Sequence, residues 1–338
     1  MLVGKQSFIF ENKPVVISTG VVGGPFEARG KIPDAFDILH DDLWMGEDSY
    51  EKAHRLLIEN AIQSALDKAN LQKEEVQFAF AGDLINQLTP TNYAMEKFQI
   101  PFFGIFNACS TSMEGLALAA ILINDAGANY VLTGAASHNA AAERQYRYPT
   151  EYGGQKPPTA QWTSTGAAYA IIGKITEQNR HEPKITSATI GKVLNPGIAD
   201  PFNMGGAMAP AAAATIASHF QDTGREFDYY DLIVTGDLGK VGKPIALDLL
   251  KQKGIILDES RFDDCGLMIY KDDQEVHAGA SGAATSAIVL YGHLLKLMKQ
   301  GTYKRILCVA TGSLHSPLSI QQNESIPVIA HAVSIEMD

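Results

Sequence analysis

Cys109 is the residue of this sequence that is best placed for covalent chemistry. It follows an apolar stretch typical of a strand, residues 101–106, and precedes a run with helical periodicity, residues 113–125. Backbone N–H groups and the dipole at the start of a helix would stabilise a thiolate, the nucleophilic form of cysteine. A free cysteine also packs as a small apolar side chain. Both interpretations of Cys109 fit the sequence.

A second group of residues suits an anionic ligand. The segment 144–162, which we expect to be a long loop, is dense in arginine, lysine and tyrosine. Guanidinium groups bind carboxylates through two parallel hydrogen bonds, and aromatic rings stack on flat heterocycles. The mixture therefore favours a planar dicarboxylate, although local ion pairs with Glu143 and Glu151 would account for the same cations. The predicted ligand contacts in this segment are Arg144, Arg147, Tyr148 and Lys156.

Further polar residues follow predicted strands. His138 and Asn139 come after a strand that we expect to end at Gly134, and ligands of α/β proteins bind beyond the carboxyl ends of such strands. Capping of the loop by the same two side chains fits equally well. We predict that Asp83 and Asp237 cap turns, with a place on the pocket floor as the alternative. The predicted ligand-binding residues also include Asp83, in its alternative place, together with Cys109, Ser281 and His315.

The composition argues against several classes of protein. The formal net charge is −11 without a dense run of lysine or arginine, so nucleic acid is not an expected partner. No apolar run approaches the roughly 20 residues of a membrane-spanning helix. The N-terminus lacks the pattern of a secretion signal, and three cysteines without CxxC spacing favour a reducing compartment over disulfides or a zinc site. We therefore expect a cytoplasmic protein with no metal cofactor.

The order of the predicted elements repeats along the chain. Strands and helices alternate in both halves, as in sheets that are covered by helices on both faces. Three segments of the first half resemble segments of the second half in the same order, which indicates an ancient duplication. The matching pairs are residues 15–22 with 185–193, 78–84 with 232–238, and 131–138 with 308–315. We predict an α/β protein with an N-terminal half, residues 1–175, and a C-terminal half, residues 176–338.

Two of the turns resemble the thiolase superfamily. Residues 107–116 (Asn-Ala-Cys-Ser-Thr-Ser-Met-Glu-Gly-Leu) are similar to the turn that carries the nucleophilic cysteine of thiolase-like enzymes, and residues 279–284 (Gly-Ala-Ser-Gly-Ala-Ala) are similar to its second-half counterpart. The resemblance covers most of the chain. It implies a thiolase-like fold, in which two pseudo-duplicated β-α-β-α-β halves pack in α-β-α-β-α layers, and it implies a homodimer.

The bases of a condensing enzyme are not found where this resemblance predicts them. An acyl transferase that uses cysteine needs partners to accept the thiol proton and to polarise the thioester carbonyl. The turn after residues 232–234 contains no histidine, and His277 stands out of register with the second expected position. Cys308 lies inside a predicted strand, which leaves His315 as the substitute, and a structural histidine fits there too. We therefore favour ligand binding over acyl transfer.

Longer stretches resemble a family of bacterial sporulation proteins within that superfamily. They are residues 81–87, 108–114, 137–140, 142–157, 264–270 and 324–327. The resemblance implies a non-catalytic protein, without a cofactor, that binds dipicolinic acid (pyridine-2,6-dicarboxylate), alone or as its calcium chelate, for uptake into the developing spore. Its implied partners are integral membrane channel proteins, which would hold it at the spore inner membrane. The alternatives are an acyl-thioester transferase that uses Cys109 and an interaction scaffold.

Overall fold

Strand pairing across the middle of the molecule joins its two halves. The structure, a computed structural model, describes residues 1–146 and 156–338. Within these residues thirteen strands belong to one sheet, and ten of them form its main path. In spatial order the ten are β12 (Phe262–Asp264), β11 (Leu232–Thr235), β14 (Arg305–Ser313), β15 (Val328–Glu336), β10 (Lys184–Thr189), β3 (Val15–Gly23), β9 (Gly166–Gly173), β7 (Tyr130–Ser137), β5 (Phe78–Gly82) and β6 (Phe102–Gly104).

The ten strands form two sets with the same arrangement. In the first half, β5 lies parallel to β6 and β7, and β9 then pairs antiparallel with both β7 and β3. In the second half, β11, β12, β14, β15 and β10 repeat this order. The two sets meet where Lys184 of β10 pairs with Val15 of β3. The predicted boundary at residues 175 and 176 falls between β9 and β10, and it remains a prediction.

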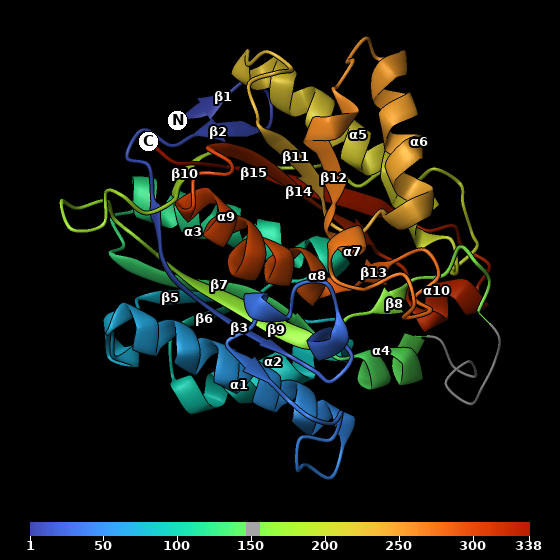
Figure 1. The fold of residues 1–338 in the computed structure, drawn as a ribbon, viewed down its shortest axis with the longest axis horizontal. Coiled ribbons are helices and arrows are strands. Elements are labelled where there is room, and N and C mark those ends of the chain that lie inside the picture. Colours follow the sequence, from blue (N-terminus) through green and yellow to red (C-terminus); the bar gives the residue numbers. More distant parts are fainter. Residues whose placement is uncertain (147–155) are drawn as a thin grey trace.

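Helices cover both outer faces and fill the centre (Figure 1). On the outer faces lie α1 (Tyr50–Ala69) and α2 (Thr89–Phe98) of the first half, and α5 (Met204–Thr223) and α6 (Gly239–Gln252) of the second. The central layer holds α3 (Thr111–Asp125), α8 (Ala283–Ile288), a π-helical turn (Val289–Leu294) and α9 (Leu295–Lys299). This layering confirms the predicted α/β fold class. The short elements are β1 (Leu2–Val3), β2 (Ser7–Ile9), β4 (Ile38–Leu39), β8 (Trp162–Thr163), β13 (Ala280–Ser281), α4 (Asn139–Tyr146), α7 (Cys265–Met268) and α10 (Pro317–Gln321).

The outer and central helices differ in their pattern of apolar residues because they bury different amounts of their surface. In α1, Leu57 and Ile62 face the sheet and are fully buried, and the Ser49 side chain accepts a backbone N–H at the start of the helix. α3 lies between the two strand sets and therefore carries small or apolar residues on most sides. There Ser112 approaches Ser286 of α8, with their hydroxyl oxygens 2.7 Å apart.

Two predicted boundaries are wrong. β7 does not end at Gly134 but continues to Ser137, because Gly134 pairs with Tyr169 of β9. A Cβ atom at Gly134 would lie 2.4 Å from the Tyr169 ring, so glycine is required inside this strand for close packing. The segment 144–162 is not entirely a loop, since α4 extends to Tyr146 and β8 begins at Trp162.

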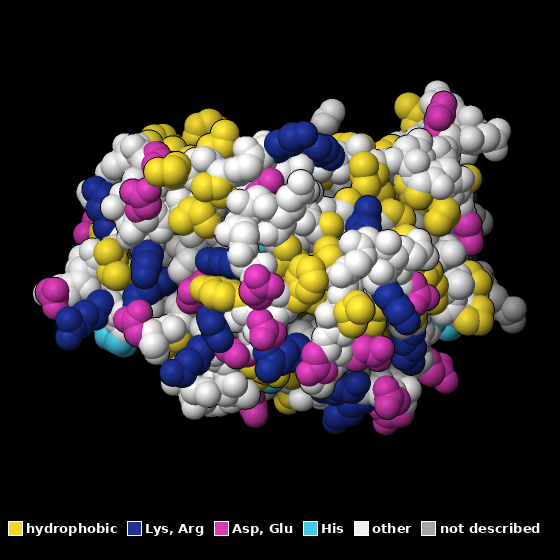
Figure 2. All heavy atoms as spheres, turned by 90° about the horizontal axis from the view of Figure 1, so that it is seen from above, with side chains coloured by type: hydrophobic (Ala, Val, Ile, Leu, Met, Phe, Trp, Pro, Cys, Tyr) yellow, Lys and Arg dark blue, Asp and Glu magenta, His cyan; other side chains and the backbone are white. Residues whose placement is uncertain are grey.

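The described surface is polar and mixed in charge. No helix within residues 1–146 or 156–338 is both long enough and apolar enough to cross a bilayer. On the face shown in Figure 2, Lys and Arg side chains lie among Asp and Glu side chains, with apolar groups between them. Neither sign of charge dominates this face.

Candidate functional site

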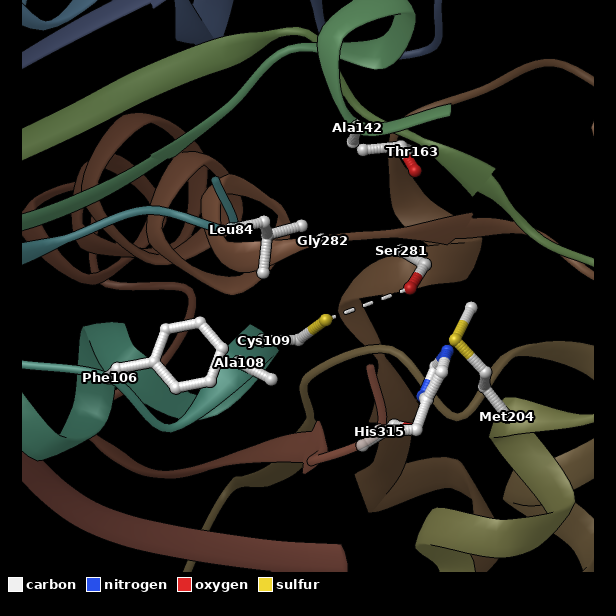
Figure 3. A pocket seen from close by; sticks show the side chains of 11 residues that line it. Leu84, Phe106, Ala108, Cys109, Ala142, Thr163, Met204, Ser281, Gly282 and His315 are labelled. Carbon is white, nitrogen blue, oxygen red and sulfur yellow. Dashed lines mark hydrogen bonds between the residues drawn. The ribbon is translucent and has the colours of Figure 1, made fainter. Parts of the chain in front are cut away.

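A pocket opens between the two halves beside Cys109 (Figure 3). Its walls come from the turn before α3, from α4 and β8, from the start of α5, from the turn before α8 and from the end of β14. The pocket and the open space at its mouth together amount to about 490 Å³. The lining residues are Leu84, Phe106, Ala108, Cys109, Ala142, Thr163, Met204, Ser281, Gly282, Ser313 and His315.

The turn that presents Cys109 has an unusual backbone. Ala108 has a φ of +50°, a left-handed conformation that residues other than glycine seldom adopt. The 3-10 turn at Ala108–Ser110 leads directly into α3. The Thr111 hydroxyl donates to the Ala108 carbonyl at 2.8 Å and accepts the N–H of Asn107 at 3.0 Å. These bonds hold Cys109 in the pocket wall with 7% of its surface exposed.

An acid, rather than a base, lies beside the Cys109 thiol. The Sγ atom is 3.8 Å from Oγ of Ser281, whose hydroxyl donates to Oδ2 of Asp237 at 2.8 Å. Asp237 also accepts from the Thr311 hydroxyl at 2.7 Å and from the N–H of Gly282 at 3.2 Å. Burial raises the pKa of the Cys109 thiol well above its ordinary value, and the neighbouring charge of Asp237 raises it further. The thiolate expected at this turn is therefore disfavoured.

Asp83, which the duplication matches with Asp237, caps a turn as predicted. Its carboxylate accepts the N–H of Ile85 at 2.7 Å and the N–H of Thr91, near the start of α2, at 3.0 Å. The Thr91 hydroxyl donates to the same carboxylate at 2.5 Å. Asp83 is buried and does not line the pocket.

In the second half the capping role belongs to a different residue. The N–H groups of Leu238 and Gly239, at the start of α6, donate to Asp264 at 2.8 and 2.9 Å. Asp237 is thereby left to bond Ser281 and Thr311, so the prediction that it caps its turn is wrong. It lies behind the Ser281 side chain and is not itself a lining residue of the pocket. Asp264 is the last residue of β12, far along the chain from this turn, so no local pattern connects the two.

The two predicted histidines lie in different places. His315 lines the pocket, and its Nδ1 is 2.7 Å from the Ser313 hydroxyl oxygen. His138 does not line it: its Nε2 is 2.9 Å from the Leu43 carbonyl oxygen, and burial lowers its pKa to about 4. The Asn139 side chain donates to a backbone carbonyl of β8 at 3.0 Å. His138 and Asn139 therefore hold loops in place, which was the alternative interpretation.

The two described cations of the segment 144–162 form ion pairs. Arg144 Nη2 lies 2.5 Å from Oε1 of Glu51 in α1, and Lys156 Nζ lies 3.1 Å from Oε2 of Glu143. Lys156 is largely buried and also lies 5.0 Å from the centre of the Trp162 ring. Neither cation is a lining residue of the pocket. The other predicted contacts, Arg147 and Tyr148, lie outside the described residues.

Sequence reasoning missed the contact between His331 and the cysteine turn. His331 in β15 is buried, and its Nε2 lies 3.2 Å from Nδ2 of Asn107, two residues before Cys109. Its Nδ1 accepts the N–H of Gly191 at 3.2 Å, and burial lowers its pKa to about 4. Asn107 and His331 are 224 residues apart, so no local pattern could have revealed the contact.

The described partners of Cys109 contain no histidine. They are Ser281, Asp237 and the backbone of Gly282. His277, the other histidine considered for catalysis, lies at a separate cavity with Lys31 and Lys240. The thiol of Cys109 is therefore hydrogen-bonded and favoured in its neutral form.

Solved structures of low sequence identity share this fold. OleA from Xanthomonas campestris has a TM-score of 0.60 and 13% identity, with 97% of this chain and 99% of that chain covered. The 3-oxoacyl-(acyl-carrier-protein) synthase III from Aquifex aeolicus has a TM-score of 0.57 and 14% identity, with 96% and 99% covered. These similarities confirm the predicted thiolase-like fold.

One sequence family matches almost the whole chain. The model of the family described as stage V sporulation protein AD (SpoVAD) matches residues 4–336. A relative from Bacillus subtilis, stage V sporulation protein AD, is 49% identical over 335 residues, which cover 99% of this chain and 98% of the relative. This protein therefore belongs to the stage V sporulation protein AD family.

Proposed function

We propose that this sporulation protein binds dipicolinic acid in the pocket beside Cys109 without converting it chemically. In this proposal it then delivers the ligand to membrane channel partners for uptake into the developing spore. Family membership supports a role in sporulation, and the pocket brings residues of both halves together beside Cys109. The resemblance of the sequence to the sporulation family supplies the identity of the ligand.

The observation that carries the non-catalytic part of the proposal is the contact between Cys109 and Asp237. Acyl transfer to a thiol requires a thiolate and donors that polarise a carbonyl. Here the thiol is buried beside a carboxyl group, and both its burial and that carboxyl group favour its neutral form. Such a site holds a ligand by shape and hydrogen bonds rather than by a covalent bond.

The pocket wall supplies groups that suit a flat heterocycle with carboxylates. Phe106 offers an aromatic surface, and the side chains of His315 and Ser313 offer hydrogen-bonding groups. Ala142 of α4 and Thr163 of β8 also line the pocket, and they flank the segment that contains Arg147 and Tyr148. We propose Arg147 and Tyr148 as further contacts because of their chemistry alone.

We also propose that the protein forms a homodimer. β6 ends the main path of the sheet, and Phe103 on this edge strand has 52% of its surface exposed. An unpaired edge with exposed aromatic side chains favours pairing with another chain. Analytical ultracentrifugation tests this part, and a monomer at micromolar concentration would contradict it.

Isothermal titration calorimetry with dipicolinate, with and without calcium, tests the proposed ligand. We expect saturable binding, and we expect Arg147→Ala and His315→Ala each to weaken it about tenfold, since a hydrogen bond to a charged group contributes about 1.5–3 kcal/mol. Arg261→Ala is the matched control because Arg261 lies on the exposed surface beside Asp258, with Nε 3.9 Å from Oδ2.

The absence of heat at millimolar dipicolinate would contradict ligand binding. The competing acyl-transferase function predicts a different result. Incubation with acyl-CoA would then give a mass increase on the intact protein that Cys109→Ser abolishes. We expect no such adduct.

A further inference from the structure

A buried carboxyl group lies directly behind the Ser281 side chain of the pocket wall, and its described partners are all uncharged groups. Asp237 has 1% of its surface exposed, and its described partners are the neutral groups of Ser281, Thr311, Gly282 and Cys109. No lysine, arginine or histidine is among these described partners. An isolated buried carboxylate is costly, because burial removes water that would otherwise stabilise its charge.

A second buried carboxyl group makes the ionised form costlier still. Asp264 is fully buried and bonds the backbone of the turn that follows Asp237. Burial raises the pKa of Asp237 above its ordinary value, and burial together with the charge of Asp237 raises the pKa of Asp264 to about 7. The titratable groups described beside Asp237 are Asp264 at the end of β12 and Cys109 before α3. His315 lines the same pocket as Cys109. β14 and the turn before α8 contribute the hydroxyls of Thr311 and Ser281.

We propose that Asp237 makes this pocket a proton-coupled anion site, in which a carboxylate ligand binds together with one proton taken up by Asp237. The inference deepens the proposed function and rests on it for the identity of the natural ligand. A dianion placed beside an ionised Asp237 would be repelled, whereas a protonated Asp237 is neutral. Affinity for anions is thus greatest at low pH and falls as pH rises through the pKa of Asp237.

The hydroxyl of Ser281 gives this coupling a structural mechanism. When Asp237 is ionised, the Ser281 hydroxyl donates its hydrogen to Oδ2, and only oxygen lone pairs face the pocket. When a solvent proton binds to Oδ2, that O–H can donate to Ser281 instead. The Ser281 hydrogen is then released to donate to a ligand carboxylate. Protonation of Asp237 therefore removes a repulsive charge and adds a hydrogen-bond donor in the same step.

Two alkylating reagents that differ in charge test the proposal through Cys109. Iodoacetate is an anion and iodoacetamide is neutral, and each forms a thioether at sulfur with loss of iodide. The rate of modification at Cys109 is measured by peptide mass spectrometry between pH 5 and pH 9. Thiol ionisation affects both rates alike and cancels in their ratio. We expect the ratio of iodoacetate to iodoacetamide rates to fall about tenfold across this range in the wild-type protein.

Three variants identify the group whose titration changes the ratio of the two rates. Asp237→Asn should give a high ratio that does not change with pH. Asp83→Asn is the matched control, because Asp83 occupies the equivalent position in the first half and bonds Thr91 instead of the pocket. It should behave like the wild-type protein. His315→Gln tests whether the pocket histidine titrates instead, and we expect the wild-type fall to persist.

Several results would overturn the proposal. They are a wild-type ratio that is independent of pH, an unchanged fall in Asp237→Asn, and a fall abolished by His315→Gln alone. If Asp237→Asn does not fold, Thr311→Val removes one hydrogen bond to the carboxylate and should move the midpoint to higher pH. An unmoved midpoint also counts against the role of Asp237.

Calorimetry separates this inference from the proposed ligand. If dipicolinate binds, its titration at pH 7 in two buffers of different ionisation enthalpy should show proton uptake that Asp237→Asn abolishes. This result tests the role of Asp237 even if Cys109 reacts with neither alkylating reagent. If dipicolinate does not bind while the reagent ratio still titrates, the ligand assignment fails and the role of Asp237 stands.

Discussion

The two halves place different residues at equivalent points of one framework. Cys109 lies two residues before α3, and Ser281 lies two residues before α8, so the two side chains meet 3.8 Å apart at the junction. Asp83 follows β5 and Asp237 follows β11. Asp83 caps its own turn, whereas Asp237 bonds Ser281.

The difference shows how a repeated framework acquires a site. In the second half Asp264 bonds the N–H groups that begin α6, the task that Asp83 performs near α2. One additional carboxylate is enough to release Asp237 from capping. A released polar side chain at the junction can approach the opposite half, and here it bonds Ser281, which contacts Cys109.

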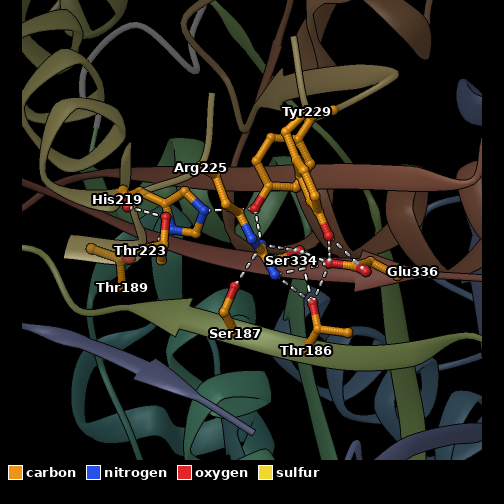
Figure 4. A network of polar contacts seen from close by, with 10 residues as sticks. Thr186, Ser187, Thr189, His219, Thr223, Arg225, Tyr229, Ser334 and Glu336 are labelled. Carbon is orange, nitrogen blue, oxygen red and sulfur yellow. Dashed lines mark hydrogen bonds and ion pairs between the residues drawn. The ribbon is translucent and has the colours of Figure 1, made fainter. Parts of the chain in front are cut away.

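The largest expected effect concerns a buried network in the second half (Figure 4). Arg225 follows α5, and its guanidinium donates to Ser187 of β10 and to Ser334 and Glu336 of β15, each at 3.0 Å. Its side chain is only 14% exposed. The corresponding helix of the first half, α1, packs through apolar residues such as Leu57. The halves would then depend on different interactions for stability.

Substitution of Arg225 tests that contrast. Arg225→Met leaves buried acceptors without a donor and should lower the free energy of unfolding by about 3–5 kcal/mol, measured by urea denaturation. Leu57→Ala, its apolar counterpart, should cost about 2–5 kcal/mol. Arg261→Met, at an exposed ion pair, should cost less than about 1 kcal/mol. A loss of similar size in Arg261→Met and Arg225→Met would show that burial of the network contributes nothing.

The second effect concerns the two capping carboxylates. Burial raises the pKa of Asp83 to about 6 and that of Asp264 to about 7, from an ordinary value near 3.8. A raised pKa in the folded state stabilises the fold below about pH 4, and this stabilisation is lost as pH rises through about 6 for Asp83 and about 7 for Asp264. Each carboxyl group contributes at most about 1.4 kcal/mol per pH unit.

Asparagine cannot ionise, so each Asp→Asn variant should weaken part of the dependence of the unfolding free energy on pH. Urea unfolding at pH 5, 6, 7 and 8 should show a smaller fall in stability for Asp264→Asn up to about pH 7, and for Asp83→Asn up to about pH 6. The slopes are compared rather than the absolute values, because the amide also changes the hydrogen bonds. Profiles parallel to the wild type would mean that neither carboxyl group changes its protonation on unfolding.

The smallest effect concerns the caps of the two long outer helices. The Ser49 side chain accepts the N–H of Lys52 at the start of α1, and the Asn203 side chain accepts the N–H of Gly206 at the start of α5, each at 3.3 Å. Ser49→Ala and Asn203→Ala should each lower the free energy of unfolding by about 1 kcal/mol. Thermal unfolding measures both. A much larger loss in one variant would show that the two helix starts are not equivalent.

Local patterns in the sequence were sufficient for most of the fold. The apolar stretch at residues 101–106 predicted a strand, and the helical periodicity of residues 113–125 predicted α3. The matched segments of the two halves predicted their repeated topology. The sequence also predicted Cys109 at a strand-to-helix turn. All of these depend on residues that are neighbours along the chain.

Burial and long-range contact decided the rest. Cys109 and Ser281 are 172 residues apart in the sequence, and Asn107 and His331 are 224 residues apart, so only folding brings each pair together. A charge pattern could not show that Arg144 would pair with Glu51 of α1. Above all, whether a carboxylate caps a turn or faces a thiol depends on which N–H groups another carboxylate already binds. That competition exists only in three dimensions, and it left Asp237 bonded to Ser281 behind the pocket wall.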